Sequence, residues 1–429
     1  MSLALVLIAM FAMILAGVPI AFTMISISIV YFLTSDFPMF VNVVPQKIFE
    51  GIDSIVFTAI PFFLLAGELM NRSGMADRLL HFSNLIIGRV RGGFAYVNVV
   101  ASLLFSGLTG VAVGDIAALG KIEVRAMEKA GYPRAFAAAV TVSSALVGPI
   151  IPPSGAIIIY CAIMDVSVGG MFLAALIPGV LMAAGDMLVI FFQARARKFP
   201  TSQSARSLPE LAKGTKDAAF ALLMPVILIG GIVGGIMTPT EAAAGAVIYA
   251  LLIGVLVYRA FGFRDLYRAL ATSGFEAARL LFLIGGALTM SWIFALEDAS
   301  GFMRDLLSFA QGNQLLLIIT INILFLILGM FMEGALIVIL FGPVVAPLAY
   351  HVGVTDLQLG IMLLINVTVG LATPPVGNVL FAMSGIARVN LGDLIKELTP
   401  FLIVKFALMV LVGLTPALTN AVPAYFGMG

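Results

Sequence analysis

The chain has 429 residues, of which 62% are hydrophobic and 10% are charged, and its formal net charge is +1. A soluble chain of this length would carry about 25% charged residues, whereas here uncharged runs such as residues 135–162 reach the ~20 residues that cross a bilayer. This composition predicts an all-α polytopic membrane protein and excludes a nucleic-acid-binding protein, which needs a basic surface. The single cysteine, Cys161, excludes an intrachain disulfide and a cysteine-ligated metal cluster.

The first half of the chain predicts five membrane crossings and one hairpin. The N-terminal segment lacks the positive region of a cleaved signal, so we expect it to remain as a span. Residues 75–90 are amphipathic and are expected to lie along the membrane surface. Residues 93–120 are apolar but contain several glycines, which predicts a re-entrant hairpin. The five predicted crossings are residues 3–16, 19–33, 54–70, 134–163 and 168–192.

The second half repeats this order after a polar linker. Residues 194–216, ARARKFPTSQSARSLPELAKGTK, form the only long polar stretch and carry six Lys or Arg, so we predict a cytoplasmic linker. It divides the chain into residues 1–193 and residues 217–429. In the second half we predict a hairpin over residues 314–350. The predicted crossings are residues 218–237, 241–257, 275–295, 356–386 and 398–414.

The two halves share their backbone-shaping residues at one constant offset of 222 positions. Glycine and proline dictate local backbone shape, so nine coincidences over about 72 positions indicate two copies of one fold rather than chance. The matched pairs are Gly107 with Gly329, Gly120 with Gly342, Gly131 with Gly353, Gly148 with Gly370, Pro152 with Pro374, Pro153 with Pro375, Gly155 with Gly377, Gly170 with Gly392, and Pro178 with Pro400.

Five crossings is an odd number, so the second copy is predicted to be inverted in the membrane. With the linker inside, 19 of the 23 Lys and Arg residues fall in inside loops. This bias was not used to draw the spans and follows the positive-inside rule. We therefore expect the linker in the cytoplasm and the N-terminus on the opposite side of the membrane.

Inverted repeats with interrupted helices are typical of secondary transporters, whose sites lie near the midplane at the broken helices. Two double-proline breaks, at residues 143–155 and 366–378, interrupt the helices at residues 134–163 and 356–386. Proline withholds an amide donor and frees a carbonyl, and free carbonyls are hard ligands suited to Na⁺. The half-helices that begin after the breaks present N-termini that favour a carboxylate.

Three buried acids are further candidates, because carboxylates inside a membrane are costly and often functional. Asp115 and Glu333 lie on the predicted hairpins and are candidates for contact with ion, proton or substrate. Asp186 lies mid-span with no broken backbone nearby, which favours a structural acid with a satisfied partner. No nucleotide-binding glycine motif stands in a strand–loop–helix setting, so we expect no ATP hydrolysis by this chain.

The sequence resembles the large membrane subunit of TRAP transporters, the tripartite ATP-independent periplasmic family, over essentially its whole length. The motifs that carry the resemblance are FSGLTGVAVGDIAALG (105–120), AGYPRAFAAAVTVSSALVGPIIPPS (130–154), MTPTEAAAGAV (237–247), LGMFMEGALIVIL (328–340) and VGLATPPVGNVLF (369–381).

The resemblance implies an elevator-type fold of the ion-transporter superfamily, in which both hairpins and both broken helices move against a scaffold of the remaining spans. It implies uptake of an organic acid driven by co-transport of two or more Na⁺ ions. It also implies a bacterial inner-membrane protein with its N-terminus in the periplasm. The two implied partners are a periplasmic substrate-binding protein and a small four-helix membrane subunit. A C4-dicarboxylate, a sialic acid and a keto acid are not distinguished.

The resemblance also implies positions for the sites. The family's first hairpin commonly reads Ser-Gly-Ser where Thr109-Gly110-Val111 stands, so one hydroxyl is absent at Val111. The first Na⁺ site would use Ser106, Thr109, Gly148, Ile151 and Pro153; the second would use Gly329, Gly370, Thr373 and Val376; and substrate would contact Thr109, Ser154, Glu333 and Asn378.

Three alternatives remain open at this stage. A self-sufficient carboxylate/cation symporter or antiporter of the same superfamily would need no binding protein. An intramembrane enzyme would use Asp115 and Glu333 as an acid–base pair and would turn over its substrate as a purified chain. A passive channel fits less well, because re-entrant hairpins of opposite sense favour alternating access.

Overall fold

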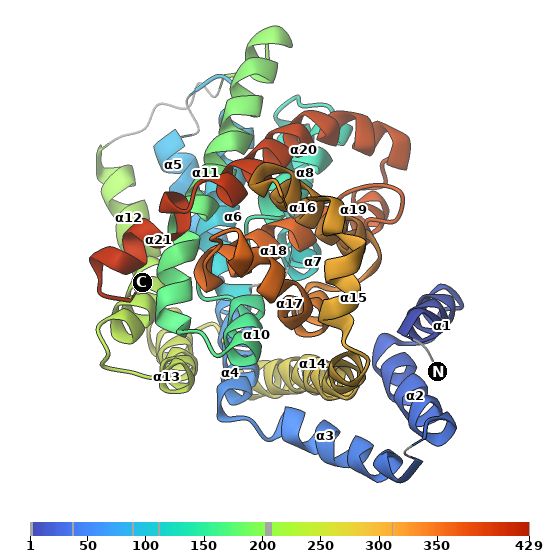
Figure 1. Ribbon diagram of the computed structural model, residues 1–429. Helices are drawn as coiled ribbons and strands as arrows, with labels where there is room; N and C mark the ends of the chain where they lie inside the picture. The colour runs from blue at the N-terminus through green and yellow to red at the C-terminus, as the bar shows by residue number, and fades with distance from the viewer. Residues whose placement is uncertain are drawn as a thin grey trace.

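The computed structural model describes residues 3–36, 38–87, 90–109, 112–201, 208–310 and 312–428, with the backbone alone described at residues 76, 105–109, 118 and 208. Helices account for all the regular structure in these ranges, and they contain no strand (Figure 1). Eight of the described helices are long and apolar enough to cross a membrane. The predicted all-α polytopic membrane fold is thereby confirmed.

The first five helices form an outer arm and the first long span. Gly17, in the left-handed region at φ +84°, and Pro19 separate the first two helices, because proline has no amide to continue the preceding helix. A 3₁₀ turn at Pro38–Asn42 leads into the third helix, which the sequence did not predict. These helices are α1 (Leu3–Leu15), α2 (Ile20–Thr34), α3 (Val43–Ile52), α4 (Ile55–Arg72) and α5 (Met75–Ile87).

The first hairpin and the first broken helix follow. The hairpin was predicted to end at residue 120, but its second arm continues as a helix to Lys129. The observed break is also narrower than the predicted one, because helix α9 continues to Ala145. The elements are α6 (Gly93–Thr109), α7 (Ala112–Asp115), a π-helical turn η2 (Ile116–Gly120), α8 (Lys121–Lys129), α9 (Arg134–Ala145), α10 (Gly155–Met164) and α11 (Val168–Ala196).

The second half opens with three long spans. Helix α12 already begins within the predicted linker, and α14 begins twelve residues before the predicted span at residue 275. Thr238 and Glu241 form a reciprocal capping box that fixes the start of α13. The elements are α12 (Leu208–Val233), α13 (Pro239–Leu252) with a π-helical end at Ile253–Val257, α14 (Phe263–Leu296) and α15 (Ala299–Leu306), followed by a 3₁₀ turn at Ser308–Ala310.

The second hairpin and the second broken helix complete the chain. The two arms of this hairpin meet at Met332 and Glu333. The elements are α16 (Gln314–Phe331), α17 (Gly334–His351), α18 (Asp356–Gly370), α19 (Asn378–Ala387), α20 (Leu391–Leu414) and α21 (Ala417–Tyr425). The half-helices α10, α18 and α19 are apolar but too short to span alone, because the breaks divide each crossing in two.

Helix starts in the two halves agree at the 222-residue offset. Five helices of the second half begin within one residue of the position that the first half predicts for them: α16 against α6, α17 against α7, α18 against α9, α19 against α10, and α20 against α11. The inverted placement of the halves in a membrane, and the division into scaffold and moving parts, stay predictions.

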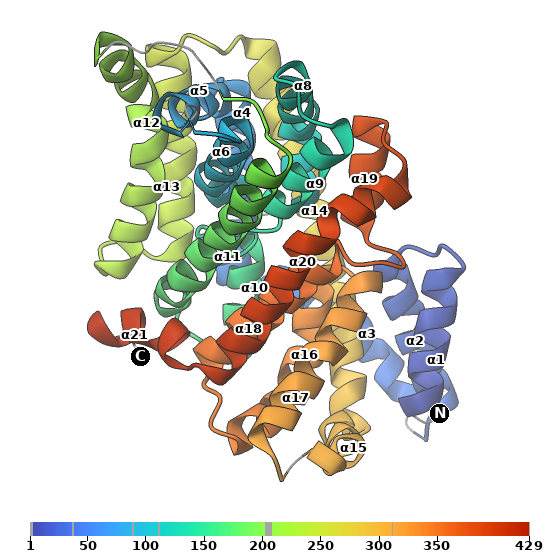
Figure 2. The same ribbon diagram turned by 90° about the horizontal axis from the view of Figure 1, so that it is seen from above.

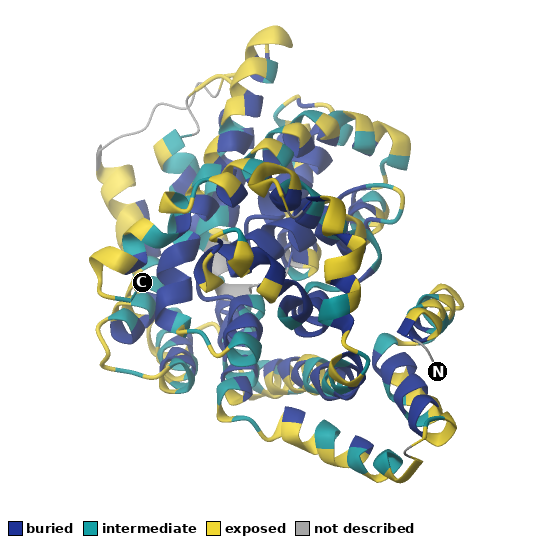
Figure 3. Ribbon diagram, in the orientation of Figure 1, coloured by how far each residue is buried: buried dark blue, intermediate teal, exposed yellow. Residues whose placement is uncertain are grey.

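The hairpins and broken helices occupy the centre of the molecule. Figures 1 and 3 show α17 and α18 in the buried interior, while α1, α2 and α3 lie at the periphery, with α3 running along α14. The long helices α11 and α20 lie side by side through the middle (Figure 2) and pack on α18 and α9, respectively. Each hairpin contacts the broken helix of the other half, α17 against α10 and the turn η2 against α19.

Candidate transport site

The first break spans residues 146–154, between α9 and α10. A proline at position i removes the hydrogen bond to the carbonyl of residue i−4, so Pro152 and Pro153 leave the carbonyls of Gly148 and Pro149 without helical donors. The hydroxyl of Ser154 replaces one of them by donating to the Pro149 carbonyl at 2.6 Å. No backbone amide in the described part of the chain donates to the carbonyls of Gly148, Ile151 or Pro153. Three of the five predicted ligands of the first Na⁺ site therefore have open carbonyls.

The second break spans residues 371–377, between α18 and α19. Pro374 and Pro375 withhold the amides that the carbonyls of Gly370 and Leu371 would accept. Val379 donates its amide to the Leu371 carbonyl at 3.2 Å, and Thr373 donates its amide to the Gly370 carbonyl at 2.9 Å. As in the first break, the carbonyl four residues before the second proline thus finds a substitute donor. Both Pro-Pro peptide bonds are cis.

Glycine allows the second hairpin to approach the second break at backbone distance. A Cβ placed on Gly370 would lie 2.7 Å from the carbonyl carbon of Gly329, and one placed on Gly329 would lie 2.9 Å from the backbone of Val367. Gly329 and Gly370, predicted ligands of the second Na⁺ site, are therefore brought together where α16 crosses α18. The Gly329 carbonyl accepts no backbone bond from a described residue.

Of the remaining predicted Na⁺ ligands, the structure describes Thr373 and Val376 in full and only the backbone of Ser106 and Thr109. Thr373 is buried, and its hydroxyl donates to the Val369 carbonyl at 2.8 Å, which leaves the oxygen lone pairs available. Val376 lies in the second break, and its carbonyl accepts no backbone bond from a described residue. The side chains of Ser106 and Thr109, and all of Val111, lie outside the described residues.

Three of the four predicted substrate residues lie at the starts of three different helices, whereas Thr109 is the last residue of α6. Ser154 is buried and caps α10, accepting weakly from the Ile157 amide at 3.5 Å. Glu333 is the N-cap residue of α17 at the tip of the second hairpin, and Asn378 is the exposed first residue of α19. Their contact with a substrate stays a prediction.

The buried acids Asp186 and Asp115 lie in different surroundings. Asp186 on α11 forms an ion pair with Lys405 on α20 at 2.9 Å and accepts a hydrogen bond from Ser143 at 2.7 Å. It is therefore an acid with satisfied partners, as expected. Asp115 is buried at the end of α7, beside the π-helical turn η2. Such turns inside helices are frequent at functional sites.

The first hairpin also carries a buried polar cluster that the sequence did not predict. Glu123 on α8 is 4% exposed and lies within hydrogen-bonding distance of Asn98 on α6. The predicted hairpin ends at residue 120 and the next predicted span begins at residue 134, so Glu123 falls between the predicted elements. The buried neighbours Val124 and Met127 alternate with charged residues, and this amphipathic pattern is the signal that marks the helix.

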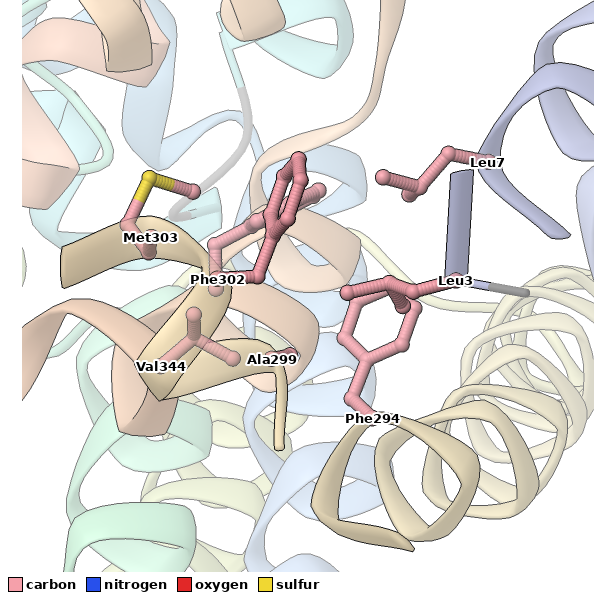
Figure 4. Close-up of a pocket in the computed structure, with 8 residues that line it drawn as sticks. Leu3, Leu7, Phe294, Ala299, Phe302, Met303 and Val344 are labelled. Atoms are coloured by element: carbon pink, nitrogen blue, oxygen red, sulfur yellow. The ribbon is translucent and has the colours of Figure 1, made fainter. Parts of the chain in front are cut away.

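A crevice elsewhere in the molecule does not suit an organic acid. Figure 4 shows Leu3 and Leu7 of α1 facing Phe302 of α15 across it. All of its lining side chains are apolar, so it offers a carboxylate no donor. They are Leu3, Leu7, Phe294, Ala299, Phe302, Met303, Phe341 and Val344.

Two interrupted apolar helices, each packed against a hairpin, are typical of secondary transporters, because unpaired backbone inside a membrane is tolerated only when it is buried in protein or lines a cavity. The sequence matches the family described as "Tripartite ATP-independent periplasmic transporter, DctM component" over residues 7–418, and the chain belongs to this family. It is accordingly a multi-pass transporter permease and not an enzyme, and the family name describes a transporter of three components.

Curated relatives span almost the full chain. The chain is 34% identical over 411 residues to the sialic acid TRAP transporter large permease protein SiaM of Vibrio cholerae, covering 96% of each. It is 35% identical over 382 residues to the C4-dicarboxylate TRAP transporter large permease protein DctM of Pseudomonas aeruginosa, covering 89% of each. It is 35% identical over 378 residues to the 2,3-diketo-L-gulonate TRAP transporter large permease protein YiaN of Escherichia coli, covering 88% of this chain and 89% of that one.

The fold also has a solved counterpart. The structure is similar to the YdaH transporter of Alcanivorax borkumensis, whose crystal structure was described as having an unusual topology, with a TM-score of 0.57, 15% sequence identity and 89% coverage of both chains. At this identity the likeness concerns the fold alone.

Proposed function

We propose that this chain is the large membrane subunit that carries out Na⁺-coupled uptake of a small organic acid across the bacterial inner membrane. The observation that carries the proposal is the pair of breaks, at residues 146–154 and 371–377, each with carbonyls that accept no backbone hydrogen bond from a described residue. Carbonyl oxygens of broken helices are suited to Na⁺ coordination in transporters of this kind.

The cations and the anion would bind at different parts of each break. The carbonyls at each break that accept no backbone hydrogen bond would hold Na⁺, one ion per half. The N-termini of α10 and α19 carry the positive ends of helix dipoles and would hold the substrate carboxylate. Opposed placement of the two breaks would put one anion between two cations, so that each ion stabilises the other. Elevator movement of the hairpins and broken helices against the outer spans would then expose this site to alternate sides.

The substrate class follows from the relatives. The names of three relatives give sialic acid, C4-dicarboxylate and 2,3-diketo-L-gulonate as substrates, and an acidic group is common to all of these. We therefore propose an acid that carries at least one carboxylate. The family description, a tripartite periplasmic transporter, agrees with two further components. We propose that these are a periplasmic binding protein and a small four-helix membrane subunit.

The experiment is uptake of radiolabelled sialic acid and succinate into proteoliposomes that contain this chain and its small membrane subunit. Uptake that requires the added binding protein supports the tripartite function. Uptake of either acid at the same rate without the binding protein would identify a self-sufficient carboxylate symporter instead.

A further inference from the structure

The first hairpin holds a buried carboxyl group that has no cationic partner among the described residues. Glu123 on α8 is 4% exposed, and none of the ion pairs in the described part of the chain includes it. Its Oε2 lies 3.1 Å from the Nδ2 of Asn98, while its Oε1 is buried and has no hydrogen-bond partner among the described residues. An ionised carboxylate in such a place is costly, and the group escapes the cost by binding a proton.

A chain of polar side chains connects Glu123 to the first break. The Nδ2 of Asn98 also donates to the hydroxyl of Thr141 at 2.7 Å, and its Oδ1 accepts from the hydroxyl of Ser144 at 2.7 Å. Ser144 in turn accepts from Ser102 at 3.0 Å. Because Ser144 stands two residues before the break begins, the charge on Glu123 is linked through Asn98 to the backbone that is proposed to bind a cation.

Few titratable side chains lie on the described elements around Glu123. The elements that pack against α8 are η2, α6, α9 and α19. Of these, η2 and α19 carry no titratable side chain, and α6 carries only Tyr96. Helix α9 carries only Arg134, which forms an ion pair with Glu128. On α8 itself Lys121, Arg125 and Lys129 are exposed. The buried Asp115 supplies the neighbouring charge. Burial, and then the Asp115 charge, raise the pKa of Glu123 to about 8.

We propose that Glu123 is a proton-binding site of the first hairpin, and that proton binding there opposes cation binding at the first break. The second part of this statement rests on the proposed function. A deprotonated Glu123 adds a negative charge to the hairpin and attracts the cation, so the cation must equally favour release of the proton, because coupling between two binding sites is reciprocal. Gly120 places the site against the second half of the chain: a Cβ there would lie 3.1 Å from the Cε of Met383 on α19.

The proton site is tested first, on the purified chain in detergent without Na⁺. A carboxyl whose pKa is higher in the folded state than in the unfolded state favours folding fully below the unfolded value, which is about 4.3, and this contribution is lost as pH rises to the folded value. The melting temperature of Glu123→Gln minus that of the wild type should therefore increase from pH 5 to pH 8 and stay constant above it. Glu128→Gln, on the exposed face of the same helix, is the matched control and should show no such increase.

A second variant keeps this test falsifiable if Glu123→Gln folds poorly. Asp115→Asn removes the charge that raises the pKa of Glu123. It should move the pH at which the wild-type stability levels off to a lower value. Parallel pH profiles for the wild type, Glu123→Gln and Asp115→Asn would overturn the proton site.

The coupling is tested by titrating Na⁺ against the melting temperature at pH 6.5 and pH 8.5, with choline chloride holding the ionic strength constant, since a bound ligand stabilises the folded state. The wild type should bind Na⁺ about fivefold or more tightly at pH 8.5, and Glu123→Gln equally at both values. An equal shift in both proteins would overturn the coupling. Absence of any Na⁺ effect in the wild type would contradict the proposed Na⁺ site and, with it, the coupling. The proton site would still be tested independently by the melting temperatures measured without Na⁺.

Discussion

The Nζ of Lys405 lies 2.9 Å from the Oδ1 of Asp186, and each of the two side chains is 1% exposed. The pair connects α20 of the second half to α11 of the first half, at the place where these long helices lie side by side. Ser143, in the last turn of α9 before the first break, donates to the same carboxylate. A buried ion pair of this kind thus ties both halves of the chain to the helix that carries the first break.

Breaking this pair should be strongly destabilising. Lys405→Met leaves an unpaired buried carboxylate, and removing one partner of a buried pair costs about 3–5 kcal/mol. The double variant Asp186→Asn with Lys405→Met removes both charges and should recover most of that loss. Unfolding in mixed micelles with increasing SDS measures the difference. A double variant as unstable as the single one would contradict a role for the pair as opposite charges.

The contact between Gly329 and Gly370 should tolerate no side chain. Gly370→Ala places a Cβ 2.7 Å from the Gly329 backbone, and backbone cannot yield as a flexible side chain can. We expect α16 to be displaced from α18 and Na⁺-dependent uptake to fall at least tenfold. Gly385→Ala on α19 is the control, because a Cβ at that position meets nothing within 4 Å. Normal uptake by Gly370→Ala would show that this close approach is unnecessary for transport.

The hydroxyl of Thr373 should strengthen Na⁺ binding. It is buried in the second break and donates to the Val369 carbonyl, so its lone pairs remain free to face a cation. Thr373→Val preserves the shape but removes the oxygen, and the Na⁺ concentration for half-maximal uptake should rise severalfold. Thr373→Ser retains the oxygen and should stay close to the wild type. An unchanged Na⁺ response in Thr373→Val would remove this residue from the site.

Sequence reasoning located the breaks because proline and glycine act locally. Pro152 and Pro374 each withhold one amide, and this effect does not depend on what the helix packs against. The same reasoning placed the edges of the breaks too widely. Ser143 and Asn366 remain helical, since proline disrupts the carbonyls before it and leaves the preceding amides free to bond.

Features that depend on contacts between distant segments could not be predicted. Lys405 lies inside the predicted span of residues 398–414, but its partner lies 219 residues away on another helix. Glu123 lies among charged residues and resembles a surface position until α6 and α9 cover it. The close approach of Gly329 to Gly370 likewise requires the crossing of α16 and α18. The residues at which the backbone breaks can thus be predicted from the positions of proline and glycine, whereas the partners of buried charges can be identified only from the fold.

The central claim is that carbonyls freed at the two breaks bind the Na⁺ that drives uptake. Its most direct test is uptake of the radiolabelled acid into proteoliposomes containing this chain, its small membrane subunit and the loaded binding protein, with an inward Na⁺ gradient or with choline replacing Na⁺. We expect accumulation of the acid only with the gradient, and collapse of this accumulation when a sodium ionophore is added. Equal accumulation in choline and in Na⁺ would contradict it.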